Sequence, residues 1–228
     1  MGVNGRGRGA PFPRWDGRSA QSLDRASIDF PGADYWVQAR NFLRRTERDI
    51  RFIVIHITGG PAMNEGPAIN HFRSSGASAH YIVNREGSIT QMVRDRDIAN
   101  HVDNIHSSSN ANGIGIEHVN PWNSAQRLRP TPAQYAASAR LVAWLCKTYE
   151  IPADHRPQRG TPGIRGHQEE QPRTSHNCPG PGWDWDGYMR SVRLAMAQES
   201  TFEETILSLA RDPFPPQIDD DGANPYGW

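Results

Sequence analysis

The chain has 228 residues, which is enough for one domain with a substantial core and extensions at its ends. Lysine and arginine total 25, aspartate and glutamate total 25, and the formal net charge is therefore zero. A neutral chain has no general attraction to nucleic acid or to an anionic membrane, so neither is expected as the main partner. No apolar run approaches the length of a membrane span, and none follows the N-terminus as in a Sec-type signal peptide.

The expected domain covers residues 34–198, and its first half contains the strand signals. Apolar runs and alternation predict four strands, at 51–57, 79–84, 88–93 and 113–119. The second and third of these are separated by a turn that ends in Gly87, so they are expected to form a hairpin. One helix is expected before the hairpin, over about 66–75.

The clearest helix signal covers about residues 132–149. Thr131 is a suitable N-cap, Pro132 suits the first helical position, and Gln134 completes the pattern of a capping box. Cys146 falls on the apolar face of this helix, where a free cysteine packs as a small hydrophobic residue.

The two ends of the chain are expected to differ from the domain. Residues 1–33 are predicted to form a leader or an arm. A helix over about 185–198 should close the domain, and Ser200 with Glu203 predicts a separate short helix to about 210. The remaining tail to residue 228 is proline-rich and acidic, so it is expected to be extended or disordered. Docking to a larger particle is the alternative for both ends.

Three residues far apart in the sequence carry the strongest chemical signal: His56, His167 and Cys178. Each lies in a short segment that restrains a side chain, namely a buried strand, a brief strand-like stretch with a glycine beside the histidine, and a proline-containing turn. Two imidazoles and one thiolate suit zinc and leave a fourth position for a catalytic water. A disulfide between Cys146 and Cys178 is the weaker alternative.

Two further residues are candidates for catalysis. Glu117 follows apolar residues in its strand and should share a face with Gly113 and Gly115, which leave room for a substrate. It is therefore expected to act as a general base, the alternative being a carboxylate at a sheet margin. His176 precedes Cys178 by two residues, so in an extended segment both side chains point to the same side. We expect His176 to stabilise an oxyanion or to bind the metal.

The sequence resembles the zinc-dependent N-acetylmuramoyl-L-alanine amidases, the family that includes phage-type amidases and peptidoglycan-recognition proteins. The resemblance runs from about Asn41 to Arg190 and is carried by several segments in family order. These segments are Ile53–Thr58, Ser78–Ile89, Gln91–Val93, Ile98–His101, Asn110–Glu117, Thr131–Tyr135, Ile164–Glu169, Cys178–Pro181 and Trp183–Trp185.

The resemblance implies a fold, a reaction and site residues. The fold would be α/β, a single domain with a mixed central sheet flanked by helices. The reaction would hydrolyse the amide between N-acetylmuramic acid and the L-alanine of the stem peptide. The three metal candidates match the family's zinc ligands and Glu117 matches its catalytic glutamate. His101 and Asn110 would contact substrate, and His80 would be architectural.

The chain departs from the family at several places near the expected site, including Asn100 and Val102-Asp103 on either side of His101. Many relatives have a lysine where this chain has His176, and others have a tyrosine where it has Ala79. A non-catalytic peptidoglycan-binding module is the alternative function, although such members usually lack the third metal ligand. Without a signal peptide, the protein would be made in the cytoplasm and reach the wall after lysis or by delivery on a phage-like particle, with peptidoglycan as its partner.

Overall fold

The structure is a computed structural model that describes residues 28–47, 49–60, 62–120, 122–123, 126–127, 129–173 and 177–211. Residues 1–27 and 212–228 lie outside the described residues, as does His176, so the predictions for residues 1–27 of the leader, for the tail and for this histidine are not tested. Phe30, inside the leader predicted over 1–33, packs in the core of the domain against Trp144. Among the described residues, none of the helices combines the length and the apolar character that crossing a bilayer demands.

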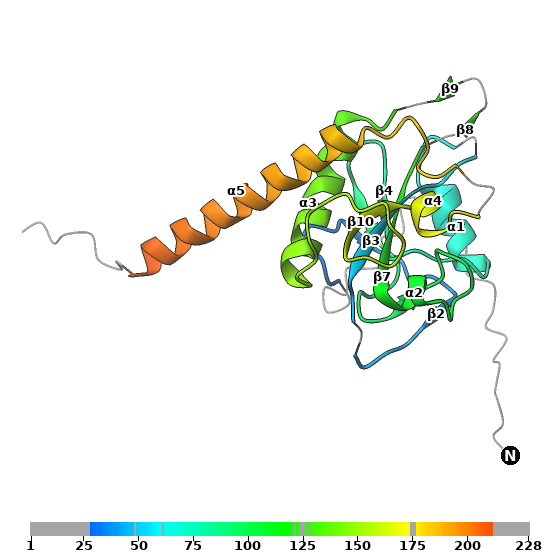
Figure 1. Cartoon of the computed structure of the whole chain (residues 1–228), viewed down its shortest axis with the longest axis horizontal. Coiled ribbons are helices and arrows are strands. Elements are labelled where there is room, and N and C mark those ends of the chain that lie inside the picture. Colours follow the sequence, from blue (N-terminus) through cyan, green and yellow to red (C-terminus); the bar gives the residue numbers. More distant parts are fainter. Residues whose placement is uncertain are drawn as a thin grey trace, which may run out of the picture.

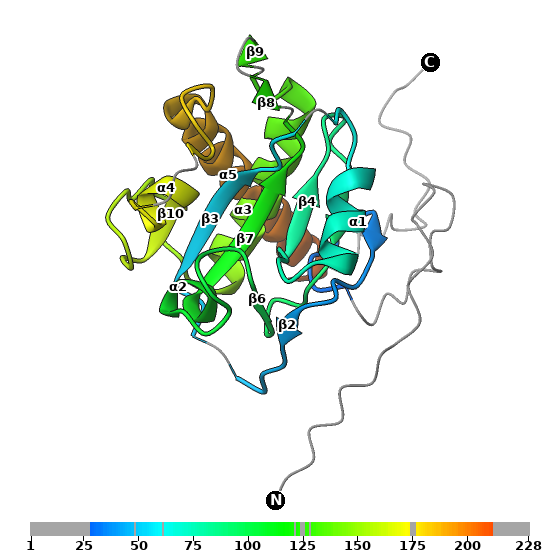
Figure 2. The same cartoon turned by 90° about the vertical axis from the view of Figure 1, so that its right-hand side faces the viewer.

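The centre of the domain is a six-stranded mixed sheet, which confirms the expected fold class (Figure 2). Its strand order is β1-β5-β4-β7-β3-β10. The strands are β1 Tyr35–Trp36, β3 Phe52–Ile57, β4 Tyr81–Val83, β5 Ile89–Gln91, β7 Gly113–His118 and β10 Gly163–Gly166. β4, β7, β3 and β10 run parallel to one another, while β5 is antiparallel to β4 and pairs in parallel with β1. All four predicted strands are present, and the predicted hairpin is β4–β5.

Shorter elements surround this sheet. Two small antiparallel pairs are formed by β2 Phe42–Leu43 with β6 Ile98–Ala99, and by β8 Trp122–Asn123 with β9 Gln126–Arg127. The helices are α1 Gly66–Ser74, α2 Ser108–Asn112, α3 Pro132–Thr148, α4 His167–Glu170 and α5 Trp185–Arg211. The predicted helices at 66–75 and 132–149 correspond to α1 and α3.

Alternation along the central strands divides the sheet into a core face and a site face. Ile53 and Ile55 of β3, with Ile114 and Ile116 of β7, are fully buried in the cluster that includes Leu141 of α3 and the start of α5. The intervening residues point to the opposite face, where the polar candidates lie. Strand periodicity therefore assigns His56 and Glu117 to the side away from α3.

The start of α3 confirms one half of the expected capping box and corrects the other. The hydroxyl of Thr131 accepts a hydrogen bond from the backbone N–H of Gln134 at 3.1 Å. The Gln134 side chain does not return to the cap. Its Nε2 donates instead to the carbonyls of Val83 and Val119, at 2.9 and 3.1 Å. The side chain thus serves carbonyls at two buried strand ends, one of which, that of Val83, also accepts from the N–H of Val119, whereas water can serve the exposed helix terminus.

The prediction of two helices after residue 185 is wrong, because α5 is continuous from Trp185 to Arg211. Ser200, the expected cap, donates to the carbonyl of Met196 at 3.0 Å, and Thr201 does the same to Ala197 at 3.0 Å. Both hydroxyls thus bond to the preceding turn inside the helix, and neither interrupts it. Figure 1 shows α5 continuing well beyond the rest of the domain.

Candidate metal centre

His56 is positioned by the parallel strands on either side of β3. It is the fifth residue of this strand, it is 2 % exposed, and it lies opposite Glu117 in the register of β7. The carbonyl of His56 accepts a hydrogen bond from Nδ1 of His118 at 2.9 Å. His118 is fully buried and its Nε2 lies 2.7 Å from the hydroxyl of Ser138 on α3. The strand end that holds His56 is therefore anchored to the helical layer.

His167 reaches His56 because β10 pairs in parallel with β3 and ends beside it. Gly166 is paired with Ile55, so His167 follows directly at the start of α4, and the two imidazole centroids are 4.7 Å apart. Nε2 of His167 lies 2.8 Å from Oε1 of Gln171. This contact orients the ring, and Gln171 was not among the residues predicted from the sequence. The sequence feature that could have identified Gln171 is its spacing of four residues from His167, which places the two side chains on one helix face.

Cys178 is brought to the same place by contacts with α4 and β3. The carbonyl of Cys178 accepts from the N–H of Gln168 at 2.9 Å, and its Sγ accepts from the N–H of Ile57 at 3.2 Å. Gly166 is required for this approach, because a Cβ there would lie 2.5 Å from Cδ of Pro179. Cys178 and Cys146 are both free thiols, so the alternative of a disulfide between them is wrong.

The side chains of His56, His167 and Cys178 converge. One donor atom from each lies within 4.8 Å of those of the other two. Burial first, and then the neighbouring His167, hold the pKa of His56 well below its usual value, so its imidazole is neutral and able to coordinate. Burial also raises the pKa of the Cys178 thiol. A buried thiol becomes a good ligand only beside a cation, which suits a site built to hold one.

His101 contacts His56 directly. Its Nδ1 lies 3.1 Å from Nε2 of His56, and its Nε2 lies 3.4 Å from the carbonyl of Gly113. A carbonyl only accepts, so Nε2 of His101 carries the proton and Nδ1 accepts from Nε2–H of His56. This arrangement assigns Nδ1 of His56 to the metal, as is usual when a ligand histidine donates its other N–H to a neighbour. The expected contact between His101 and substrate stays a prediction.

Glu117 lies on the same sheet face as His56. Its side chain is partly exposed, but its Oε2 is buried and has no hydrogen-bond partner among the described residues. Burial raises the pKa of this carboxyl group to about 8. A carboxyl group with an unpaired oxygen and a raised pKa is suited to taking up a proton near neutral pH.

His80 has the architectural role that was expected. It is fully buried, its Nδ1 accepts from the N–H of Gly115 at 3.0 Å, and its Nε2 donates to the carbonyl of Asp97 at 3.2 Å. It therefore connects β7 to the turn before β6 and supports the strand that carries Glu117.

Asn110 has a different role from the expected substrate contact. It is fully buried in α2, and its Oδ1 accepts from the N–H groups of His101 and Val102 at 3.1 and 2.9 Å. Its Nδ2 donates to the carbonyls of Val102 and Asn104 at 2.6 and 2.9 Å. A fully buried amide that holds a loop in this way does not face a substrate. Asn110 instead fixes the loop that presents His101.

A comparison with known protein families identifies the family of the chain. A family model described as N-acetylmuramoyl-L-alanine amidase matches residues 46–181, which is more than half of the chain. The chain belongs to the N-acetylmuramoyl-L-alanine amidase family. The matched range includes all three metal candidates of the chain, together with Glu117, His101 and His80. A comparison with curated proteins gives no match.

Solved structures support the amidase fold. A selenomethionine derivative of AmpD is 24 % identical, with a TM-score of 0.51, over 72 % of this chain and 95 % of that chain. Hydrolase AmiA of Staphylococcus aureus, solved with its ligand, is 13 % identical with a TM-score of 0.55, over 78 % of this chain and 89 % of its own. The endolysin LysCS of Clostridium intestinale URNW is 17 % identical with a TM-score of 0.50, over 71 % of this chain and 97 % of that chain. At these identities the likeness concerns the fold.

Proposed function

We propose that this protein is a zinc-dependent amidase that hydrolyses the bond between N-acetylmuramic acid and the L-alanine of the stem peptide. Membership of the amidase family gives the reaction class. The observation that carries the zinc assignment is the convergence of His56, His167 and Cys178 within 4.8 Å. Two imidazole nitrogens and one sulfur are a donor set that zinc prefers over magnesium or calcium, and three protein ligands leave one coordination position for chemistry.

The residues present fit such an ion. Each imidazole has Nε2 in a hydrogen bond inside the protein, to His101 in one case and to Gln171 in the other. Such partners orient ligand histidines in metal sites generally. His167 is partly exposed whereas His56 and Cys178 are buried, so the site is reached from the His167 side. When bound, zinc supplies a Lewis acid that polarises a carbonyl group and lowers the pKa of water.

Glu117 moves the protons of the reaction. Its carboxylate takes a proton from the attacking water as the oxygen of that water bonds to the amide carbon. It then returns the proton to the departing nitrogen as the carbon–nitrogen bond breaks, so atoms and charges balance. The buried, unpaired Oε2 is the atom best suited to hold that proton. The role expected for His176 in stabilising the oxyanion stays a prediction.

The test combines metal analysis with product analysis. The purified protein should contain one zinc per chain and release free stem peptide from peptidoglycan. Glu117→Gln should keep its zinc and lose at least about 100-fold in turnover, because general acid–base catalysis contributes that much or more. Glu86→Gln, an exposed residue in the β4–β5 turn, is the matched control and should remain active.

Two outcomes would contradict the proposal. Zinc binding without any release of stem peptide would indicate a non-catalytic peptidoglycan-binding module. Retention of more than about a tenth of the turnover in Glu117→Gln would remove Glu117 from proton transfer. Delivery to the wall by lysis or on a phage-like particle stays a prediction, since residues 1–27 and 212–228 lie outside the described residues.

A further inference from the structure

A cavity lies near the edge of the sheet opposite the candidate metal centre. It is about 220 Å³ in volume and is bordered by Trp36 of β1, Phe42 of β2 and the turn between β5 and β6. β1 is the edge strand opposite β10, and four strand spacings of about 4.8 Å place it roughly 19 Å from β3. The cavity is therefore separate from the three metal candidates.

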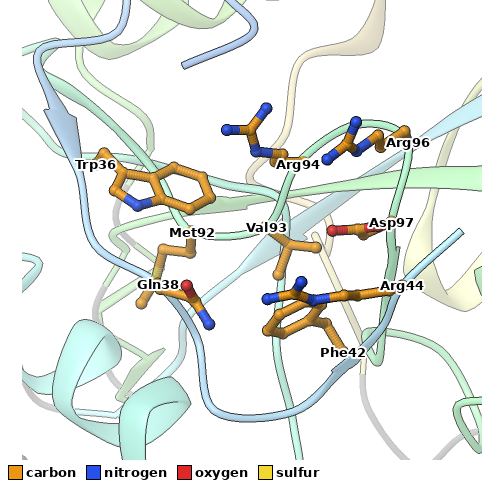
Figure 3. A pocket seen from close by; sticks show the side chains of 9 residues that line it. All are labelled: Trp36, Gln38, Phe42, Arg44, Met92, Val93, Arg94, Arg96 and Asp97. Carbon is orange, nitrogen blue, oxygen red and sulfur yellow. The ribbon is translucent and has the colours of Figure 1, made fainter. Parts of the chain in front are cut away.

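Three arginines converge on this cavity, which we call the arginine pocket. They are Arg44, Arg94 and Arg96, and Figure 3 shows their side chains and that of Trp36 arranged around it. Arg44 and Arg96 are exposed, and within the described part of the chain neither forms an ion pair. Asp97 contributes one carboxylate to the lining, and the guanidinium groups of Arg44 and Arg96 remain available to an anionic ligand.

Backbone contacts hold the arginine pocket in shape. The N–H of Asp97 donates to the carbonyl of Arg94 at 2.9 Å and closes the turn that carries Arg94 and Arg96. The carboxylate of Asp97, 5 % exposed, accepts from the N–H of Arg45 at 3.0 Å and ties this turn to the segment after β2. Oδ1 of Asp97 therefore helps to hold the two segments that line the pocket in place. The guanidinium groups are thus presented from two connected segments.

Apart from the polar side chain of Gln38, the remaining lining is apolar. Met92 and Val93 are fully buried and form part of the lining, the Trp36 ring is partly exposed, and the guanidinium of Arg44 lies 6.0 Å from the centre of the Phe42 ring. Guanidinium groups bind phosphate and carboxylate through paired hydrogen bonds, and aromatic faces pack against sugar rings and other apolar surfaces. Two guanidinium groups outside any ion pair match a phosphate monoester, which carries close to two negative charges, better than a single carboxylate.

We propose that the arginine pocket binds a phosphate group carried on a sugar or a polyol. This ligand goes beyond the amidase reaction, and its binding does not depend on that reaction. The cavity is smaller than a typical site for a drug-sized molecule, so it holds one anionic group and part of the adjoining ring. A nucleic acid fits less well, because single strands are bound in extended cationic grooves with several stacking residues.

The test follows binding by NMR on the full-length protein, with the tryptophan indole signals as reporters. The chain has seven tryptophans, and Trp36→Phe identifies the signal that belongs to Trp36. Glucose 1-phosphate should shift this signal saturably at concentrations up to about 10 mM, with inorganic phosphate weaker and glucose without effect. The measurement needs no hydrolysis, so its result and that of the amidase test are independent.

Two double variants provide the decisive comparison. Arg44→Gln with Arg96→Gln should raise the Kd for glucose 1-phosphate at least tenfold, since about 1.4 kcal/mol is lost with two charge-assisted contacts. Arg190→Gln with Arg193→Gln removes two exposed arginines from α5 and should leave the Kd unchanged. Equal unfolding temperatures and zinc contents of the two variants would show that both are folded.

Four results would overturn the proposal. The first is the absence of a saturable shift at Trp36. The second is equal weakening by the two double variants, which would indicate general charge attraction. The third is glucuronate binding as tightly as glucose 1-phosphate, which would assign the pocket to carboxylates. The fourth is tighter binding of a short oligothymidylate, also lost in the Arg44 and Arg96 variant, which would assign it to nucleic acid.

Discussion

Nε2 of His56 and Nδ1 of His101 are 3.1 Å apart, and this contact links the candidate metal centre to the loop before α2. Nδ1 of His101 accepts a hydrogen bond from Nε2–H of His56 and so directs the other nitrogen of His56 toward the metal. We predict that His101→Phe lowers zinc affinity about 10- to 100-fold, the usual cost of losing such a partner. Competition with a chelator measures this, and His106→Phe, an exposed histidine on the same loop, should match wild type. Unchanged affinity in His101→Phe would show that the contact does not tune the ligand.

Gly115 gives His101 the space for this contact. A Cβ at Gly115 would lie 2.7 Å from Nδ1 of His101, closer than side-chain atoms approach one another. We therefore expect Gly115→Ala to displace the ring and to weaken zinc binding at least about tenfold. Gly76→Ala is the control, because a Cβ there meets nothing within 4 Å. Zinc affinity equal to wild type in Gly115→Ala would contradict this account.

We expect the Asn110 side chain to contribute to the stability of the fold and not to contact substrate directly. Asn110→Ala removes a buried amide that serves two N–H groups and two carbonyls. We predict a loss of at least about 2 kcal/mol in the free energy of unfolding, measured with urea, because buried partners are left unpaired. Ser108→Ala, at an exposed position of the same helix, should change it by less than about 0.5 kcal/mol. A stable Asn110→Ala that binds substrate poorly would restore a direct role in recognition.

The lowered pKa of the buried His118 makes the free energy of unfolding depend on pH. Burial lowers the pKa of its imidazole to about 4, whereas an unfolded chain has the ordinary value near 6.5. Between these values the unfolded state binds a proton that the folded state does not, so stability is full above about pH 6.5 and falls toward pH 4. One such group contributes a slope of up to about 1.4 kcal/mol per pH unit.

The measurement is urea unfolding of the zinc-free protein at pH 7, 6 and 5. His118→Gln should reduce the slope by up to about 1.4 kcal/mol per pH unit, with His56, whose pKa is also lowered by burial, keeping its own share. His71→Gln, at an exposed position, should leave the pH dependence as in wild type. Working without zinc removes the pH dependence of metal binding from the comparison. An equal slope in His118→Gln would mean that other groups carry the acid sensitivity.

Local patterns predicted most of the elements because periodicity and caps act over a few residues. The run from Phe52 to Ile57 has strand character on its own, and Thr131 caps α3 as expected. The errors arose where a side chain had a choice of partner. Ser200 bonds to the preceding turn of α5 when it was expected to begin a helix, and Gln134 serves two strand ends when it was expected to serve its own cap.

The amino-acid sequence by itself determined which groups are available for chemistry: two imidazoles and a thiol for a metal, and a carboxylate beside small residues. It also determined the sheet face of His56 and Glu117, because alternation in a strand is a local property. Only the tertiary structure decided that the metal candidates meet within 4.8 Å and that His101 supports His56. His56 and His101 are separated by 45 residues, so their contact depends on packing between segments distant along the chain. The order β10-β3-β7 likewise brings His167 and Glu117 to either side of His56, and no local propensity specifies that order.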